Sequence, residues 1–352
     1  MRRLIVTVAL MAAAGAAPAL ADPAKTVQYL AQSYVIPHFR AVADATVKQE
    51  AAWTTFCSDR ARGNASILRE EFDHVGDAWA EIEFIRVGPA VAGLRVDRFN
   101  YWLDRRDAAG HTLDAMLAST DPKSLDETTI AGGSVAGQGM PVLERLLYDD
   151  AVLKQLKAPG DAGDRRCAVG RAIAHNLSVI ADAIATDWSK PDGAGAAIAA
   201  NRAWGPHFAN TSQAASVMVT DLVNGIEMLK DFKVALIYHD IANPGALRLA
   251  EGSRSGRTLH DIELNFAGIH AALDAFMAPA SAADKAQLEG AFADAGRKLA
   301  GVEALEKQKD PKRRLAALKS AIDSFGTLKQ TAMDLIPKAT GISLGFNNLD
   351  GD

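Results

Sequence analysis

The sequence lacks a long membrane-spanning run, an excess of basic residues and the common catalytic motifs, and each shortage excludes a class of protein. Beyond residue 21 no segment is long and apolar enough to cross a bilayer, which takes about 20 apolar residues. Removal of Arg2 and Arg3 with the first 21 residues leaves 36 of the 38 Lys and Arg against 43 Asp and Glu. This net charge of −7 argues against nucleic-acid binding. The motifs of zinc peptidases, P-loop enzymes, serine hydrolases and dinucleotide-binding enzymes are all missing.

The first 21 residues have the pattern of a secretory signal peptide. The basic pair Arg2-Arg3 precedes an apolar stretch over residues 4–14, and the segment closes with Ala19-Leu20-Ala21. This order of a basic start, a short apolar stretch and an A-x-A end is typical of an export signal, and the alternative is a buried N-terminal helix. We expect cleavage between Ala21 and Asp22, and a protein of the periplasm or cell envelope without a lipid anchor.

Composition and periodicity predict an all-α protein. Alanine is abundant, clusters of β-branched residues are sparse, and no pair of segments carries a hairpin signal. Apolar residues at spacings of three and four predict helices, one of them interrupted at Pro37. The predicted helices cover residues 22–57, 64–87, 141–148, 164–188, 217–236, about 257–276, 282–307 and 311–333. The polar, turn-rich stretch 119–138 is predicted to be a long loop.

The length predicts two domains. The mature chain of 331 residues exceeds what one core usually supports. The turn-forming run Ser189-Lys190-Pro191-Asp192-Gly193 is the best boundary. We therefore expect an N-terminal helical bundle over residues 22–190 and a C-terminal helical bundle over residues 191–352, each of about four long helices.

Two cysteines, Cys57 and Cys167, are the only ones in the chain. In an oxidising compartment an even pair predicts a disulfide, which here would close a loop of about 110 residues. The chain-entropy model gives such a bridge roughly 4–5 kcal/mol of stabilisation. The alternative is a metal site, although two cysteines without a nearby histidine are a poor zinc pattern.

Two places in the sequence carry candidate metal-binding or polar chemistry. His260 and Glu263 are three residues apart on a predicted helix and could share a ligand, although an exposed pair on a helix face is the alternative. Glu144 lies in an otherwise apolar helical run. A carboxylate on a buried face needs a cation, a metal or hydrogen-bond donors. The alternative is that Glu144 pairs with a nearby arginine and only fixes the packing.

Several segments, in one order along the chain, resemble the imelysin family, also called the M75 peptidase-like family. The most specific is the end of the chain, Gly345-Phe346-Asn347-Asn348 followed by Asp350-Gly351-Asp352. The other segments are Val35-Ile36-Pro37, Trp79, Arg86-Val87-Gly88-Pro89, Trp102-Leu103-Asp104-Arg105, residues 139–148, Arg166-Cys167 and residues 251–265. The resemblance implies two helical bundles related by approximate internal symmetry with a pocket between them. It also implies an envelope protein tied to iron acquisition.

The family's metal-binding motif is incomplete in this chain. The motif is Gly-x-His-x-x-Glu, and the matching stretch has Gly139 and Glu144 but Pro141 in place of the histidine. The chain therefore resembles the imelysin-like subgroup that lacks the histidine. Glu144 remains a candidate ligand for iron or another divalent metal, but peptidase activity of the M75 type is not expected. Leu103 is a second departure, because the family often has proline there.

The resemblance implies eight pocket residues with complementary chemistry. Arg86 and Asp104 would supply charge, Trp102 an apolar wall, and Glu144 an acceptor or ligand. Ser253 and Ser255 would offer hydroxyls near a helix start. The remaining two candidates, in the C-terminal tail, are Asn347 and Asp350. The alternative is a polar network that joins the two domains without a ligand.

These observations favour a non-catalytic envelope protein that serves iron uptake by binding a metal ion or a small acidic ligand between its domains. One alternative is an M75-type metallopeptidase, which would need three zinc ligands that the sequence does not offer. The other is a periplasmic interaction partner of an outer-membrane iron receptor or transporter, with no ligand of its own.

Overall fold

The computed structural model of the chain describes residues 22–60, 62–242, 247–278, 280–306 and 310–344. The predicted signal peptide and the candidate residues Asn347 and Asp350 lie outside these ranges. Within them the chain is helical and has no strand, apart from an isolated bridge between Trp204 and Phe208. The predicted fold class, all-α, is confirmed.

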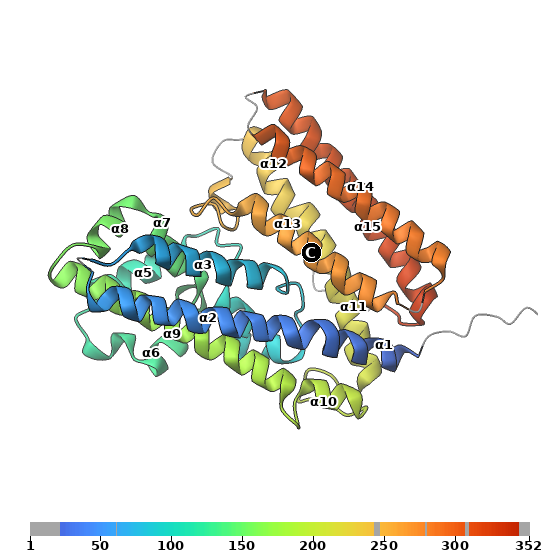
Figure 1. Cartoon of the computed structure of the whole chain (residues 1–352), viewed down its shortest axis with the longest axis horizontal. Coiled ribbons are helices and arrows are strands. Elements are labelled where there is room, and N and C mark those ends of the chain that lie inside the picture. Colours follow the sequence, from blue (N-terminus) through green and yellow to red (C-terminus); the bar gives the residue numbers. More distant parts are fainter. Residues whose placement is uncertain (1–21, 61, 243–246, 279, 307–309, 345–352) are drawn as a thin grey trace, which may run out of the picture.

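Long helices form the frame of the N-terminal half. The first is continuous and consists of α1 (Pro23–Leu30), the π-helical turn η1 (Ala31–Val35) and α2 (Ile36–Ser58). The interruption expected at Pro37 takes the form of this π-helical turn, since proline offers no N–H to the helical ladder. Helices α3 (Ala65–Ala80) and α9 (Asp161–Ser189) pack along α2 (Figure 1).

Helix α3 ends at Ala80, so the prediction of a helix to residue 87 was wrong. The carbonyls that would continue it have partners elsewhere: Asn265 donates to the Ala80 carbonyl and the Tyr34 hydroxyl donates to the Glu81 carbonyl. Ile82 is nevertheless fully buried from the turn that follows. The apolar periodicity therefore reported burial correctly beyond the end of the helix.

Short helices connect α3 to α9. One of them, α7, begins at Met140, and Pro141 lies in its first turn, as the sequence predicted. The stretch 119–138 is not a bare loop but holds three short helices, the first capped by Asp121, whose carboxylate accepts from the Lys123 amide at 2.9 Å. The connecting elements are η2 (Gly88–Ala90), η3 (Ala92–Leu94), α4 (Arg95–Phe99), α5 (Ala108–Ala118), η4 (Pro122–Leu125), α6 (Glu127–Ala131), η5 (Val135–Gly137), α7 (Met140–Tyr148) and α8 (Asp150–Leu156).

The C-terminal half is a second group of helices. Helices α14 and α15 run side by side along its outer edge, and α13 lies between them and the N-terminal half (Figure 1). The elements are α10 (Ala194–Ala199), α11 (Thr211–Glu227), the π-helical η6 (Met228–Val234), α12 (Ala235–Ala242), η7 (Leu247–Leu249), α13 (Thr258–Phe276), α14 (Ala282–Glu306) and α15 (Pro311–Thr340).

The two groups of helices share their apolar interior. Helix α1 contacts α11 and α13, and α3 contacts α13. The buried apolar side chains form one cluster that runs through both groups. The predicted domain boundary lies in the turn between α9 and α10, and α10 packs back on α9 and α1. The division into two domains and their internal symmetry stay predictions.

A disulfide joins Cys57 at the end of α2 to Cys167 in α9, with the two Cα atoms 5.7 Å apart. The predicted pairing is confirmed, and the alternative of a metal site at these cysteines was wrong. The bridge ties together two helices that are 110 residues apart in the sequence.

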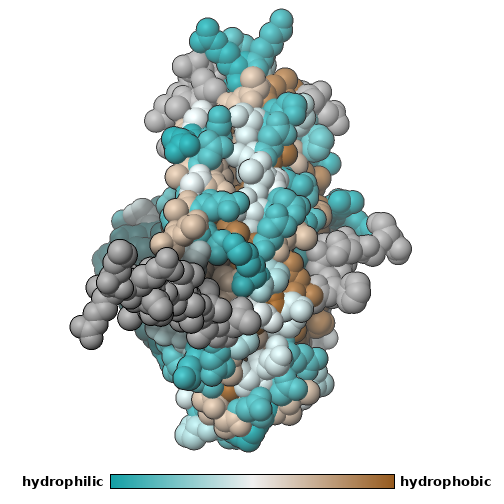
Figure 2. Space-filling view, turned by 90° about the vertical axis from the view of Figure 1, so that its right-hand side faces the viewer, coloured by the Kyte–Doolittle hydropathy of each residue, from teal (hydrophilic) through white to brown (hydrophobic). Residues whose placement is uncertain are grey.

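None of the helices in the described ranges is both long and apolar enough to cross a membrane. Figure 2 shows the side of the molecule where α14 and α15 lie, and hydrophilic side chains alternate there with neutral and apolar ones. The inward side of α14 is apolar, since Leu288, Phe292, Ala295 and Leu299 are all buried.

Candidate functional site

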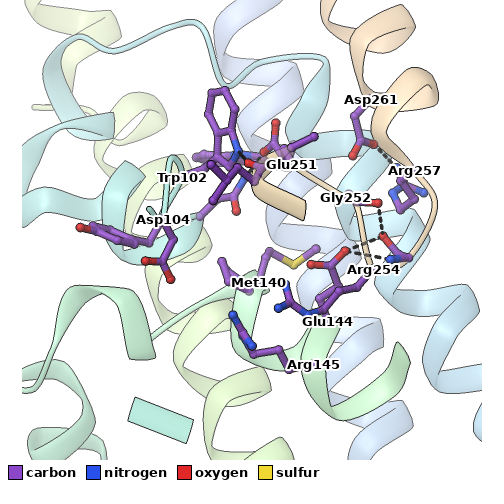
Figure 3. A pocket seen from close by; sticks show the side chains of 18 of the residues that line it. Trp102, Asp104, Met140, Glu144, Arg145, Glu251, Gly252, Arg254, Arg257 and Asp261 are labelled. Carbon is purple, nitrogen blue, oxygen red and sulfur yellow. Dashed lines mark hydrogen bonds and ion pairs between the residues drawn. The ribbon is translucent and has the colours of Figure 1, made fainter. Parts of the chain in front are cut away.

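A cavity of about 180 Å³ lies where the two groups of helices meet. Its walls come from α3, from the segment 100–107, from α7 and from residues 248–257, which lead into α13. In the view of Figure 3, Glu144, Arg145 and Arg254 lie on one side of the cavity and Trp102 and Asp104 on another. The site therefore combines residues that are more than 100 positions apart in the sequence.

Helix α7 brings Glu144 to the cavity because its first residues fit tightly against α4. A Cβ atom at Gly139 would lie 2.0 Å from the Phe99 carbonyl oxygen, so only glycine permits this approach. Pro141 then sets the first turn, and it lines the cavity one helical turn before Glu144. The glycine of the family motif thus has a structural reason, and the position of its histidine does face the cavity.

Glu144 is only 8% exposed, and a serine from the other half of the chain satisfies one of its oxygens. Oε1 accepts hydrogen bonds from the Ser255 amide at 3.0 Å and from the Ser255 hydroxyl at 2.8 Å. Oε2 accepts none from the described residues. The neighbouring Arg145 forms its ion pair with Asp107 instead. In place of the arginine that the alternative interpretation named, Ser255 contacts Glu144, and one carboxylate oxygen has no hydrogen bond from the described residues.

Trp102 and Asp104 build the opposite wall. The Trp102 indole N–H donates to the Leu249 carbonyl at 2.9 Å. Asp104 accepts from the amides of Ala108 and Ala109 at 2.8 and 2.9 Å, and so caps the start of α5. Its carboxylate is thus already engaged by backbone donors. The Trp102–Leu103 peptide bond is cis.

A buried lysine lies beside this wall. Lys233 of η6 is 4% exposed, and its ammonium contacts Glu83, Asn265 and Glu251, the last at 2.5 Å. Burial alone would lower the pKa of Lys233, but the carboxylates of Glu251 and Glu83 outweigh it and raise the pKa. Lys233 is therefore charged, and its two carboxylates neutralise it. We call Lys233, Glu83, Glu251 and Asn265 the lysine cluster.

Arg257 is the centre of a second neutralised group. Its Nη2 lies 2.5 Å from Asp77 and 2.7 Å from Asp261, and its Nη1 lies 3.3 Å from Asp73. Burial first, and then repulsion from Glu251, raises the pKa of Asp261 to about 8. This guanidinium has no capacity left for a ligand.

Two other arginines of the same segment differ from Arg257. Arg248 and Arg254 line the cavity and are exposed. Among the described residues no carboxylate lies within ion-pair distance of either guanidinium. The cavity thus has two cationic groups whose charge the described protein does not neutralise.

The predicted site residues divide into three sets. Trp102, Asp104, Glu144 and Ser255 line the cavity. Arg86 does not, because it pairs with Asp97 at 2.6 Å and its amide donates to Asp221 at 2.7 Å. Ser253 does not either, and its hydroxyl donates to the Arg248 carbonyl at 3.3 Å. The two tail residues lie outside the described ranges. Whether any of the eight binds a ligand stays a prediction.

Sequence reasoning missed Arg248, Arg254, Arg257 and Lys233. Three of these are arginines within ten residues, in or beside a polar segment that precedes a helix, and that density was the available signal. Lys233 gave none, because a lysine within an amphipathic helix is usually on its exposed face. Only its position in η6 places it between two distant carboxylates.

The described residues do not supply a ligand set by which the protein alone would hold a metal ion at Glu144. No three of their His, Cys, Asp or Glu side chains converge as a ligand set. Around Glu144 the structure places a serine, a proline and arginines, and neither proline nor an arginine guanidinium ligates metal. The His260–Glu263 pair does not supply a site either, since among the described residues no set of three such side chains converges there. We therefore derive no chemistry through a bound metal here.

Comparisons with known proteins find a family match over most of the chain and solved structures with a similar fold. The family model described as Imelysin matches residues 35–332. An imelysin-like protein from Psychrobacter arcticum 273-4 has a similar structure, with a TM-score of 0.68, 20% identity, and 93% of this chain and 99% of that chain covered. A candidate iron-regulated protein A precursor from Parabacteroides distasonis ATCC 8503 gives a TM-score of 0.71 at 14% identity, covering 93% and 97%. No curated protein sequence matches the chain significantly.

Proposed function

The chain belongs to the imelysin family, and from that premise we propose that it is an exported, non-catalytic binding protein that takes a small ligand into the cavity at Glu144. The observation that carries this proposal is the cavity itself, whose walls come from both halves of the chain. A ligand held there would contact both halves, as is typical of binding sites between packed units. The proposed physiological role is iron acquisition.

The site supports binding better than catalysis. Asp104 is engaged by backbone amides, Arg145 by Asp107, and Arg257 by three carboxylates. The cavity wall formed by the described residues contains no histidine or cysteine. The Glu144 oxygen that accepts from the Ser255 hydroxyl also accepts from the Ser255 amide, so this bond fixes the segment to α7. This arrangement supports recognition of a ligand that leaves unchanged.

The proposed location and role rest on separate support. The export pattern at residues 1–21 and the disulfide are both typical of proteins that mature outside the cytoplasm. The support for an iron association is that a protein with a similar fold is described as iron-regulated. Export is tested by sequencing the N-terminus of the protein from a periplasmic fraction. Asp22 as the first residue is expected, and an intact Met1 in the cytoplasm would contradict export.

Ligand binding is tested with the mature chain purified under native conditions from the envelope of its host. Mass spectrometry of the supernatant after denaturation is expected to reveal a small molecule, and isothermal calorimetry of the emptied protein should show that it rebinds. The variant Glu144→Ala should weaken that binding. Arg62→Gln is the control, because Arg62 is 90% exposed and, among the described residues, pairs with Asp59. A protein that releases nothing and gives no heat with iron salts or small organic acids would refute the proposal.

A further inference from the structure

Resting on the proposed function, we propose that the ligand is a small hydroxycarboxylate anion whose carboxylates are bound by Arg248 and Arg254 and whose hydroxyl or bound cation meets Glu144. Such carboxylates are present in two forms of the ligand, the free acid and its chelate with ferric iron. The inference concerns the class of ligand, which neither the family match nor the similar structures specify.

Arg248 and Arg254 carry positive charges that form no ion pair with the described residues. The mature chain has a net charge of −7, so carboxylates outnumber cationic groups over the molecule as a whole. Arg248 and Arg254 nevertheless have no carboxylate partner among the described residues, and the one acidic residue between them, Glu251, pairs with Lys233 instead. Guanidinium groups bind carboxylates through two parallel hydrogen bonds and are the usual protein groups for this recognition.

Arg257, the third arginine of the segment, differs from these two because it forms ion pairs within the protein. Arg257 is 8% exposed and bonded to Asp77 and Asp261, and it fixes the segment to α3. The backbone of the segment is also ordered by its own hydrogen bonds, from the Arg257 amide to the Gly252 carbonyl at 2.8 Å and from the Thr258 hydroxyl to the Glu251 carbonyl at 2.7 Å. The free guanidinium groups are thus held at the cavity on a supported backbone, which lowers the entropic cost of binding.

The size of the cavity limits the size of the ligand. At about 180 Å³ it is smaller than the roughly 300–1,000 Å³ of sites for drug-sized ligands. A small acid therefore fits better than a peptide or a sugar polymer. The side chains of Phe72, Trp79 and Met140 supply apolar surface for its carbon skeleton, since all three are more than nine-tenths buried and line the cavity.

One carboxylate oxygen of Glu144 is available to contact a ligand. Its Oε1 is occupied by Ser255, whereas Oε2 accepts no hydrogen bond from the described residues. An anion made only of carboxylates would meet repulsion at this oxygen, because two like charges at short range disfavour each other. A hydroxyl that donates to Oε2, or a cation within the ligand, removes that repulsion. Glu144 therefore selects a hydroxy acid or its metal chelate over a plain polycarboxylate.

The experiment is calorimetric titration of the mature, disulfide-bonded chain with three probes. These are citrate, ferric citrate and propane-1,2,3-tricarboxylate, which has the carboxylates of citrate without its hydroxyl. Citrate or ferric citrate is expected to bind, and the one that binds more tightly identifies the source. Propane-1,2,3-tricarboxylate should bind at least about tenfold more weakly, as expected for one lost hydrogen bond to a charged group. Affinity should fall when salt is added.

The variants separate the two groups of the site. The double variant Arg248→Gln/Arg254→Gln should lose about tenfold to a hundredfold in affinity for citrate and for its chelate. Glu144→Gln should reduce the preference for citrate over propane-1,2,3-tricarboxylate. Arg62→Gln is the control and should leave all affinities unchanged.

Some outcomes would overturn the inference while the proposed function stands. Binding of bare ferric or ferrous ion that needs Glu144 but not the arginines would do so, and so would a neutral molecule recovered from the native protein. Citrate affinity equal in the wild type and the double arginine variant would also overturn it. If neither these probes nor any co-purified molecule binds, the proposed function itself fails.

Discussion

Two sets of charged side chains lie side by side at the junction of the helix groups, and they differ in how completely their charges are neutralised. The lysine cluster is buried, and each of its charges contacts an opposite one. In the cavity set, Arg248 and Arg254 are exposed, and the buried Glu144 keeps one carboxylate oxygen without a hydrogen bond from the described residues. The first arrangement stabilises the fold and the second is available to a ligand. Neighbouring charges in one junction can thus have separate roles.

The largest effect should come from the lysine cluster. Lys233→Met leaves Glu83 and Glu251 buried without their cation, and we expect the free energy of unfolding to fall by about 3–5 kcal/mol. Urea denaturation followed by circular dichroism measures it. Lys230→Met is the control on the same π-helical turn, since the Lys230 ammonium pairs with the partly exposed Asp231 at 3.1 Å. Adding Glu83→Gln and Glu251→Gln to Lys233→Met should restore part of the loss, and no recovery would count against the charge explanation.

Asp221 shares features with both sets. It is buried like the lysine cluster, but its carboxylate has no ion-pair partner among the described residues and accepts a hydrogen bond from the Arg86 amide. Burial raises the pKa of Asp221 to about 7, against the lowering effects of that bond and of the Arg86 charge. Since the folded-state pKa is above the ordinary value near 4, ionisation at higher pH destabilises the fold. This loss of stability is absent below about pH 4, develops as pH rises towards the folded-state pKa of about 7, and is complete above it.

The variant Asp221→Asn should therefore be more stable than the wild type by on the order of 2–4 kcal/mol at pH 8. The difference should shrink as pH falls and vanish near pH 4, where the wild-type side chain is protonated in both states. Thermal and urea unfolding across this pH range measure it. Asp182→Asn, at a side chain that is 65% exposed, should show no such trend. A constant difference at every pH would contradict the raised pKa.

The link across the cavity should have a smaller effect. Ser255→Ala removes the hydroxyl that donates to Glu144 but keeps the amide that donates to the same oxygen, so we expect a loss of about 1 kcal/mol. Ser253→Ala is the matched control two residues away, where the hydroxyl makes only a long bond to a carbonyl. Equal unfolding free energies for the two variants would show that the bond to Glu144 is not maintained in solution.

The smallest effect on stability should come from the arginines that matter most for binding. Arg248→Gln/Arg254→Gln removes exposed charges without described carboxylate partners, so the free energy of unfolding should change by less than about 0.5 kcal/mol. The same protein sample used for the citrate titration can be unfolded in urea. A loss comparable to that of Lys233→Met would show that these arginines belong to the structural charges instead.

Much of the fold could be predicted from residue patterns. The helical class and the long helices followed from the spacing of apolar residues, and the disulfide followed from the even cysteine pair. The start of α7 followed from the proline in its first turn. Patterns failed where a distant residue intervened: α3 ends at Ala80 because Tyr34 and Asn265 bond to carbonyls that would extend it. A local rule cannot include such partners, since they are brought together only by packing.

For the candidate site, the sequence identified individual residues but not their partners. Glu144 and Ser255 were both expected near a pocket, yet their hydrogen bond joins positions 111 apart. Arg86 had the residue type of a ligand-binding group and is instead paired with Asp97. An arginine's role depends on whether a carboxylate is within reach, and this is a property of three-dimensional distance.

The sequence by itself determined the helical class, the single disulfide pairing and the incomplete metal motif at Pro141, because each depends on residue type and local spacing. Only the tertiary structure decided which charges are neutralised. It buries Lys233 between two carboxylates, fixes Arg257 to α3, and leaves Arg248 and Arg254 at the cavity. The physical reason is that charge pairing falls off within a few ångströms, whereas these partners lie up to 180 residues apart in the chain.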